Sequence, residues 1–216
     1  MDVIYEPWES LQGRIAGWPD KDGIPEGCRL NLGCGTVILP PEEGWVNVDQ
    51  FPLPGVNLQA NLFTFPWPFE DNSADYILAS HIVEHIPHQV HEWIDLYHLK
   101  PIPQDGFFVF FREVWRILKS SGLITVLVPY GFSWGGLQDP THTRYIVPST
   151  FSYLGQSDRL NFDYGLDYAF EIVGGGVFNY ANPQYDFESA LAANQFYVNT
   201  ILTLRADLRP VKGGGK

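Results

Sequence analysis

Short apolar segments that alternate with helical ones restrict this chain to one class of fold. The segment Arg29–Leu32 has the composition of a buried strand, and Gly33 and Gly35 end it. The same patterning predicts further strands at 45–49, 56–60, 74–80 and 123–128, and helices at 80–86, 88–99 and 106–119. Strands that alternate with helices pair in parallel, so we expect a doubly wound α/β fold with a mostly parallel sheet.

The C-terminal part of the chain has a different pattern. Residues 169–178 and 199–208 resemble two strands joined by a long connection, and we expect them to close one edge of the sheet with an antiparallel pair. At 216 residues the chain is long enough for one domain with a sizeable core. We expect this domain at 28–210, an irregular N-terminal arm at 1–27 that packs on it, and a flexible tail at 211–216.

The chain is strongly acidic. Its 25 acidic and 13 basic side chains give a formal net charge of -12, and no run of lysines or arginines interrupts this excess. An acidic surface repels phosphate backbones, which argues against binding of bulk nucleic acid. The charge therefore favours a small molecule, a saccharide or a protein side chain as the partner.

Cysteine usage and hydropathy indicate the compartment. Cys28 and Cys34 flank one short strand, which holds their Cα atoms too far apart for a disulfide, so we expect two reduced, buried thiols. The acidic segment 1–7 lacks the apolar core of a signal peptide, and no apolar run is long enough to span a bilayer. These features predict a cytoplasmic protein without membrane contact.

Two glycines and an aspartate predict a nucleoside site. In an open α/β sheet, ligands bind beyond the carboxyl ends of the strands, near the point where the strand order reverses. Gly33 and Gly35 allow the chain to turn there and let a ligand approach the backbone. Asp49 ends the next predicted strand and can accept hydrogen bonds from ribose hydroxyls.

The segment after the glycines distinguishes between two kinds of nucleoside ligand. A dinucleotide requires a helix that begins at the glycine loop, because the helix N-terminus stabilises the pyrophosphate. Here Pro40 and Pro41 leave little room for a helix, Glu42 and Glu43 follow, and the third glycine of the dinucleotide fingerprint is missing. S-adenosylmethionine has no phosphate and carries a positive sulfonium, so the loop suits it better.

Five segments, in order along residues 28–130, resemble the motifs of class I (Rossmann-like) S-adenosylmethionine-dependent methyltransferases. They are 30–35 (LNLGCG), 47–49 (NVD), 68–77 (PFEDNSADYI), 80–86 (SHIVEHI) and 113–123 (EVWRILKSSGL). The resemblance implies a Rossmann-like methyltransferase fold, with S-adenosyl-L-methionine as the cofactor.

The resemblance also implies the cofactor contacts. The glycine loop would line the methionine and ribose portions, Asp49 would bind the ribose hydroxyls, and Ser80 and His81 would face the methionine end. The family usually has an acidic residue after the third strand that binds the adenine amino group; this chain has Asn61, followed by Leu62, and the amide oxygen of Asn61 can accept the same hydrogen bond. The implied cofactor site is Asn31, Leu32, Gly33, Cys34, Gly35, Asp49, Asn61, Leu62, Ser80 and His81.

The segment 81–85 (HIVEH) also fits H-x-x-E-H, the inverted zinc-peptidase motif. That hypothesis requires a helix that places His81 and His85 one turn apart on zinc, with Glu84 as general base and a further ligand downstream. The same residues already form part of a methyltransferase motif directly after a strand. We therefore favour the methyltransferase interpretation and expect no metal.

Histidines supply the candidate general bases. Methyl transfer is an in-line displacement, so positioning contributes most of the catalysis, but an alcohol acceptor must also lose a proton. His81 and His85 are expected near the methyl donor. The segment 139–142 (DPTH) follows the fifth strand and is expected to form a second cluster on the same rim, where His142 is the candidate from the acceptor-binding loop. The structural alternatives are that Asp139 and His142 pin this loop by hydrogen bonds and that Glu84 favours a helix start.

Further aromatic residues have two possible roles, and further histidines have no expected function. Tyr130 and the segment 133–136 (SWGG) either line an acceptor pocket, since aromatic walls suit sugars and planar rings, or pack in the core. The remaining histidines lie in a polar stretch and are expected to be solvated; they are His88, His91 and His98.

The expected function is methyl transfer to an oxygen or nitrogen of a small-molecule or saccharide acceptor. Two alternatives stay open. A catalytically silent module would keep the S-adenosylmethionine pocket without the chemistry. An NAD-dependent oxidoreductase would use the same glycines for a dinucleotide, and cofactor binding distinguishes it from the other two.

Overall fold

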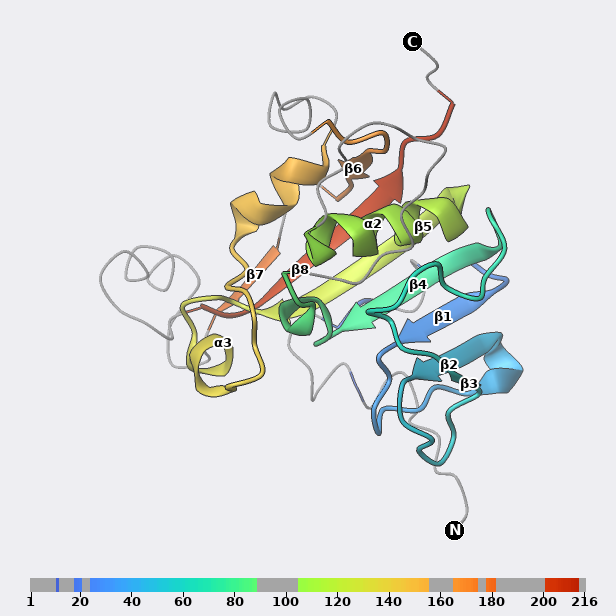
Figure 1. Cartoon of the computed structure of the whole chain (residues 1–216), viewed down its shortest axis with the longest axis horizontal. Helices are drawn as coiled ribbons and strands as arrows, with labels where there is room; N and C mark the ends of the chain where they lie inside the picture. The colour runs from blue at the N-terminus through green and yellow to red at the C-terminus, as the bar shows by residue number, and fades with distance from the viewer. Residues whose placement is uncertain are drawn as a thin grey trace.

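One sheet of eight strands organises the chain (Figure 1). The computed structural model describes residues 11, 18–20, 24–88, 105–155, 165–174, 178–181 and 201–213, with the backbone alone for 178–181. The strands are β1 (Arg29–Leu32), β2 (Trp45–Asp49), β3 (Leu58–Gln59), β4 (Ala74–Ser80), β5 (Leu118–Pro129), β6 (Phe170–Ile172), β7 (Phe178–Ala181) and β8 (Ile201–Pro210). Their order is β3-β2-β1-β4-β5-β8-β6, and β7 also pairs with β8.

The first five strands are parallel, as the alternating sequence pattern predicts. β1 pairs with both β2 and β4, β3 extends the sheet beyond β2, and β5 extends it beyond β4. The strand order therefore reverses at β1. The carboxyl ends of β1, β2 and β4 meet at this switch point, where ligands of open α/β sheets bind.

The predicted antiparallel C-terminal edge is confirmed. β8 runs antiparallel to β5, with Asp207 opposite Thr125, and both β6 and β7 pair antiparallel with β8. The single strand expected at 169–178 is wrong, because β6 ends at Ile172 and β7 is a separate strand. Gly174, with φ of 77°, takes a left-handed conformation between them, which an extended strand does not tolerate.

Side chains of the central strands alternate between two cores, as the pleat of a strand requires. Ile77 of β4 and Ile124 of β5 belong to the larger core. The helix α2 (Gly106–Ile117) supplies four buried phenylalanines to that core, Phe107, Phe108, Phe110 and Phe111, and lies across this face of the sheet (Figure 1). Tyr76 and Leu78 belong to a second core on the opposite face, together with Leu11, Trp18, Ile24, Leu39, Trp45 and Leu127.

Local chemistry defines both ends of α2. The Asp105 side chain caps the first turn, accepting a hydrogen bond from the backbone N–H of Phe107 at 2.9 Å. The helix predicted at 106–119 is confirmed, but it ends at Ile117, two residues early. Leu118 already pairs with Ala74 as the first residue of β5, so tertiary pairing outweighs helical spacing there.

The helix expected at 80–86 is wrong. Ser80 still belongs to β4, and His81 has φ of 55°, which interrupts regular structure. A single 3-10 turn follows, η3 (Val83–His85), and Ile86 is extended, as expected for a residue before a proline. His81 and His85 are therefore not stacked on one face of an α-helix.

Three shorter elements complete the described part of the chain: η2 (Pro41–Glu43), α3 (Trp134–Gln138) and η4 (Pro148–Leu154). From the expected N-terminal arm, Leu11, Trp18 and Ile24 pack in the second core. The helix expected at 88–99 falls, apart from residue 88, outside the described residues, as do His91 and His98. Within the ranges that the structure describes, no helix is long and apolar enough to cross a membrane.

Candidate functional site

The loop after β1 adopts a conformation that requires glycine. Gly33 and Gly35 have φ of 65° and 52°, in the left-handed region where a Cβ atom is strained. A Cβ on Gly33 would also lie 3.0 Å from Cδ1 of Ile82. Gly33 therefore allows the segment after β4 to approach the glycine loop, which brings the ends of β1 and β4 together.

Asp49, the last residue of β2, holds this loop in place. Its Oδ2 accepts a hydrogen bond from the N–H of Gly35 and its Oδ1 one from the N–H of Phe51, each at 2.9 Å. Each carboxylate oxygen has two lone pairs, so both can accept a second hydrogen bond from a ligand hydroxyl. Asp49 is 8% exposed, and the exposed part lines a cleft.

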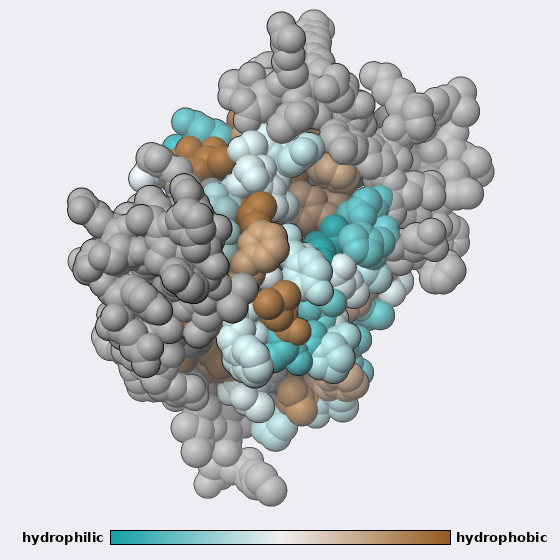
Figure 2. Space-filling view, turned by 90° about the vertical axis from the view of Figure 1, so that its left-hand side faces the viewer, coloured by the Kyte–Doolittle hydropathy of each residue, from teal (hydrophilic) through white to brown (hydrophobic). Residues whose placement is uncertain are grey.

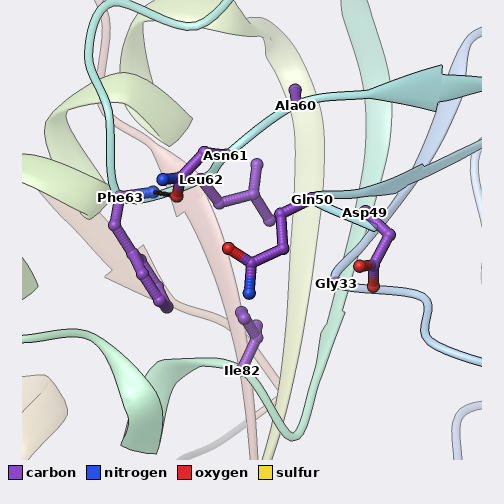
Figure 3. Close-up of a pocket in the computed structure, with 8 residues that line it drawn as sticks. All are labelled: Gly33, Asp49, Gln50, Ala60, Asn61, Leu62, Phe63 and Ile82. Atoms are coloured by element: carbon purple, nitrogen blue, oxygen red, sulfur yellow. Dashed lines mark hydrogen bonds between the residues drawn. The ribbon is translucent and has the colours of Figure 1, made fainter. Parts of the chain in front are cut away.

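An open cleft lies beyond the carboxyl ends of β1 and β2 (Figure 3). Gly33 and Asp49 border it on one side, and the segment after β3 borders it on the other. Figure 3 shows the side chain of Gln50 extending between these walls toward Ile82. The lining residues are Gly33, Asp49, Gln50, Ala60, Asn61, Leu62, Phe63 and Ile82.

Asn61 replaces the expected acid and forms a turn. Its Oδ1 accepts a hydrogen bond from the N–H of Phe63 at 2.9 Å, and its backbone carbonyl accepts one from the N–H of Thr64 at 3.1 Å. One lone pair of Oδ1 remains for a ligand amino group. Asn61 and Leu62 thus lie in the cleft, where the sequence places them.

Asn31 and its neighbours in the predicted site serve the scaffold. Nδ2 of Asn31 donates to the carbonyl of Val37 at 2.8 Å and to Oδ1 of Asn47 at 3.0 Å, which ties the glycine loop to β2. Leu32 is fully buried in the larger core. Asn31, Leu32, Cys34 and Gly35 are absent from the lining of the cleft.

Cys34 is a buried neutral thiol, and both cysteines are free, as expected. Burial, together with the nearby Asp49 carboxylate, raises the pKa of Cys34 to about 12. Burial and the charge of Asp75 also raise the pKa of Cys28, which is only half-buried. Neither thiol is suited to act as a nucleophile near neutral pH.

Ser80 and His81 lie at the end of β4 but outside the lining of the cleft. The N–H of His81 donates to the carbonyl of Leu127 at 2.8 Å, while its side chain is 48% exposed. Nδ1 of His81 is 3.4 Å from Oε1 of Glu84. The side chain of His81 is therefore oriented toward η3.

The other two candidate bases form a cluster with Glu84. One possible metal-binding atom from each of Glu84, His85 and His142 lies within 4.8 Å of the others. The rings of His85 and His142 meet edge to face, with centroids 4.7 Å apart. The structure thus brings His142 to η3 from a distant part of the sequence, at the rim formed by the ends of β4 and β5.

Hydrogen bonds fix the loop that carries His142 against η3. Thr143 donates from its N–H to the carbonyl of Glu84 at 2.9 Å and from its hydroxyl to the carbonyl of Ile86 at 2.6 Å. Arg144 donates to the Ile86 carbonyl at 3.0 Å and to the Asp105 carboxylate at 2.9 Å. The histidine cluster is therefore held by rigid backbone on both sides.

Comparisons with known proteins agree with this geometry. No protein-family model matches the sequence, and no curated protein matches it. Solved structures do match. An S-adenosylmethionine-dependent methyltransferase from Archaeoglobus fulgidus aligns with a TM-score of 0.50 at 17% identity, over 94% of this chain and 94% of that chain. A candidate methyltransferase of the same kind from Listeria monocytogenes aligns with a TM-score of 0.51 at 17% identity, over 95% of this chain and 98% of that chain.

The chain has the class I methyltransferase fold. A third structure shows what this fold leaves open: a [4+2]-cyclase, SpnF, aligns with a TM-score of 0.50 at 14% identity, over 94% of this chain and 78% of that chain. Proteins with different named activities thus share the architecture, so the reaction must be argued from the site.

Within the methyltransferase fold, the motif residues at 68–77 and 113–123 build the scaffold. Oε2 of Glu113 accepts a hydrogen bond from the N–H of Trp67 at 2.8 Å. Arg116 donates to the carbonyl of Phe69, to Asp71 and to Glu113, at 2.7–2.9 Å. These contacts fasten the turn before β4 to α2. The residues of these two motifs therefore stabilise the fold and do not take part in the reaction.

Aromatic residues near α3 extend the rim of the methyltransferase fold. Phe132 and Trp134 are 52% and 65% exposed, and Leu137 and Tyr145 are also exposed. Figure 2, which shows the side of the molecule that carries α3, has separate brown apolar patches among paler and teal residues. Nδ1 of His142 is bonded to the carbonyl of Gly136 in α3, so this apolar surface adjoins the histidine cluster. Tyr130, by contrast, is 7% exposed and packs in the larger core.

His88 is exposed, as expected, but it has hydrogen-bond partners. Its Nδ1 is 3.1 Å from Asp105 and its Nε2 is 2.8 Å from the carbonyl of Thr143. It braces the acceptor loop from outside the cluster of Glu84, His85 and His142.

Four of the eight residues that line the cleft were not predicted from the sequence. Gln50, Ala60, Phe63 and Ile82 each directly precede or follow a residue that the motifs identify, so adjacency along the chain was the available signal. The position of His142 after the fifth strand predicted the rim that it shares with His85, but its contact with η3 depends on how the loop after β5 folds back.

Proposed function

We propose that this chain is an S-adenosylmethionine-dependent methyltransferase. The observation that carries the proposal is the cleft that Gly33 and Asp49 border, at the switch point of a sheet with the methyltransferase order. After Gly35 the chain forms no helix before η2, a turn of three residues. No helix N-terminus therefore faces the cleft from this loop to stabilise a pyrophosphate, which favours S-adenosylmethionine over NAD.

The cofactor residues take distinct roles in this proposal. Asp49 accepts hydrogen bonds from the ribose hydroxyls, and Asn61 accepts one from the adenine amino group. The apolar side chains of Leu62 and Ile82 pack against the adenosine portion. Asn31, Leu32, Cys34 and Gly35 support the site by shaping the glycine loop. Ser80 and His81 lie where the methionine end would leave the cleft.

The proposed acceptor is a small molecule or a saccharide, methylated on oxygen or nitrogen. The net charge of -12 disfavours nucleic acid, and the exposed aromatic residues near α3 offer flat surfaces for a sugar or a planar ring. We expect the acceptor to bind at the rim formed by the ends of β4 and β5, beside the cofactor cleft. Positioning there supplies most of the rate enhancement.

His81, His85 and His142 remain the candidates for accepting the proton of the acceptor. Nδ1 of His142 donates to the Gly136 carbonyl, which leaves Nε2 as a proton acceptor. If His142 is the base, His142→Ala should lower kcat by about 100-fold or more and leave the Kd for S-adenosylhomocysteine unchanged. Equal losses in both quantities would contradict this role.

The direct test is transfer of a labelled methyl group from S-adenosylmethionine to panels of hydroxylated and amino-bearing small molecules and saccharides. We expect at least one panel member to gain a methyl group, with release of S-adenosylhomocysteine. Tight cofactor binding without transfer to any acceptor would favour a silent binding module. Hydride transfer with NAD would contradict the proposal outright.

A further inference from the structure

Glu84 presents a buried carboxylate with no hydrogen-bond partner. Its side chain is 2% exposed, and among the described residues none donates a hydrogen bond to Oε1 or Oε2. Nδ1 of His81 is 3.4 Å from Oε1, longer than the roughly 2.7–3.2 Å of protein N–H···O hydrogen bonds. Burying a carboxylate without a hydrogen-bond donor is costly, so a cation bound at Glu84 would stabilise it.

The neighbouring imidazoles have fixed tautomers that leave lone pairs free. Nδ1 of His142 lies 3.0 Å from the Gly136 carbonyl, which can only accept, so Nδ1 donates there, and Nε2, 3.8 Å from Oδ2 of Asp139, is the nitrogen left for a ligand. Nδ1 of His85 lies 3.0 Å from Oγ1 of Thr141. The single proton of that hydroxyl is donated to Asp139 at 2.7 Å, so Nδ1 of His85 must be the donor.

This arrangement is typical of metal-binding histidines. A histidine that ligates a metal through one nitrogen usually donates a hydrogen bond from the other to a carbonyl or a hydrogen-bonded oxygen, which fixes its ring. Here both rings are fixed in this way, next to a carboxylate that lacks a donor. Two imidazoles and one carboxylate form a donor set that divalent transition metals prefer.

We propose that Glu84, His85 and His142 bind one divalent transition-metal ion of the zinc type. The site differs from the H-x-x-E-H motif in its ligands: His142 replaces His81, and Glu84 is a ligand and not a general base. The loop that carries His142 is fastened to η3 by Thr143, so the three ligands are held together before a metal arrives. Three protein ligands leave coordination positions open.

The site has a consequence that rests on the proposed function. An acceptor hydroxyl bound at an open position would ionise more readily, because the cation stabilises the alkoxide while the proton passes to solvent. The alkoxide oxygen would then form a bond to the methyl carbon as the methyl–sulfur bond breaks. In that case His85 and His142 hold the ion, and His81 is the one candidate base that stays free of it.

The test measures metal binding directly on the full chain, without any acceptor. Protein stripped with a chelator is titrated with Zn²⁺ against a chromophoric competitor and with Co²⁺ by visible absorption, with Mg²⁺ as the control ion. We expect about one Zn²⁺ per chain, a Co²⁺ spectrum with nitrogen ligation, and no measurable binding of Mg²⁺, which prefers oxygen ligands. Absence of Zn²⁺ and Co²⁺ binding by the wild-type chain would overturn the proposal.

Variants separate ligation from folding. Glu84→Gln and His142→Ala should each weaken Zn²⁺ binding by more than about 100-fold, whereas Asp71→Ala, an exposed carboxylate bound to Arg116 and outside the cluster, should bind as wild type. Metal-free Glu84→Gln should melt no lower than metal-free wild type, because the amide removes a buried charge, and Zn²⁺ should raise the melting temperature of wild type alone. Wild-type affinity in His142→Ala or in Glu84→Gln would contradict the assignment.

The same samples separate this inference from the proposed function. Binding of S-adenosylhomocysteine does not involve Glu84 or His142, so it should be equal in wild type and both variants. If the cofactor binds and Zn²⁺ does not, the metal site is wrong and the methyltransferase proposal stands. If Zn²⁺ binds and S-adenosylhomocysteine does not, the reverse holds.

Discussion

The carboxylate of Asp49 has two roles, one in the glycine loop and one in the proposed cofactor site. It accepts hydrogen bonds from the backbone at Gly35 and Phe51, and in the proposed function it also accepts the ribose hydroxyls. The sequence indicates the second task from the position of Asp49 at the end of a strand. It does not reveal the first, because that contact depends on the left-handed turn of the glycine loop.

Replacing Asp49 should therefore affect the cofactor more than the fold. Hydrogen bonds to a charged group contribute about 1.5–3 kcal/mol each, so Asp49→Ala should raise the Kd for S-adenosylhomocysteine by roughly 100-fold. Asp49→Asn keeps the shape and one acceptor oxygen and should have a smaller effect. Isothermal titration calorimetry measures both, with Asp71→Ala, an exposed carboxylate bound to Arg116, as the unchanged control. An unchanged Kd in Asp49→Ala would remove this residue from the site.

At the scale of elements, the turn before β4 and the helix α2 are joined by Glu113 and Arg116. Glu113 is 9% exposed and pairs with Arg116 at 2.8 Å. Glu113→Ala would leave the Arg116 guanidinium and the N–H of Trp67 without this acceptor. We expect the free energy of unfolding to fall by about 2–4 kcal/mol in urea titrations. Asp71→Ala, whose carboxylate is 69% exposed, should cost less than about 1 kcal/mol; equal costs would contradict a buried role for Glu113.

The start of β4 is joined to β5 by an ion pair that makes stability depend on pH. Burial raises the pKa of Asp75, but hydrogen bonds from Nζ of Lys119 and the N–H of Cys28 outweigh it, so the pKa lies below its ordinary value. A lowered folded pKa stabilises the protein above the unfolded value of about 3.9, and this contribution is lost as pH falls through the folded pKa.

Asp75→Asn should therefore be less stable than wild type at about pH 7, and the difference should shrink below about pH 4. Urea unfolding at several pH values measures this difference. A difference between the two proteins that stays constant from neutral to acidic pH would show that ionisation of Asp75 does not contribute.

The elements that the sequence predicts well are those with local causes. The bounds of β1, β2 and β4 agree with the predicted ranges, because consecutive residues determine both the apolar strand and the turns that flank it. The predictions fail where a distant segment decides: Leu118 leaves its helix to pair with Ala74, and His81 turns left-handed after Ser80. One strand was predicted at 169–178, but the structure has two, because Gly174 is left-handed between them. The alternation of apolar and polar residues does not reveal this turn.

At the scale of the whole molecule, the mostly parallel sheet and the cofactor cleft could be expected from the sequence, as could the rim that His142 shares with His85. Gly33, Asp49, Asn61 and Leu62 do gather in one cleft. The acceptor rim combines η3 with a loop that follows β5. Only the folded chain brings His142 to Glu84.

In the proposed function the cleft holds S-adenosylmethionine and not a dinucleotide. Thermal unfolding of the full chain with S-adenosylhomocysteine, with NAD and without ligand tests it most directly, because a ligand that binds the folded state raises the melting temperature by mass action. At a ligand concentration of about 100 times Kd, the stabilisation is about 2.7 kcal/mol. We expect S-adenosylhomocysteine to raise the melting temperature and NAD to leave it unchanged; a shift with NAD alone would contradict the account.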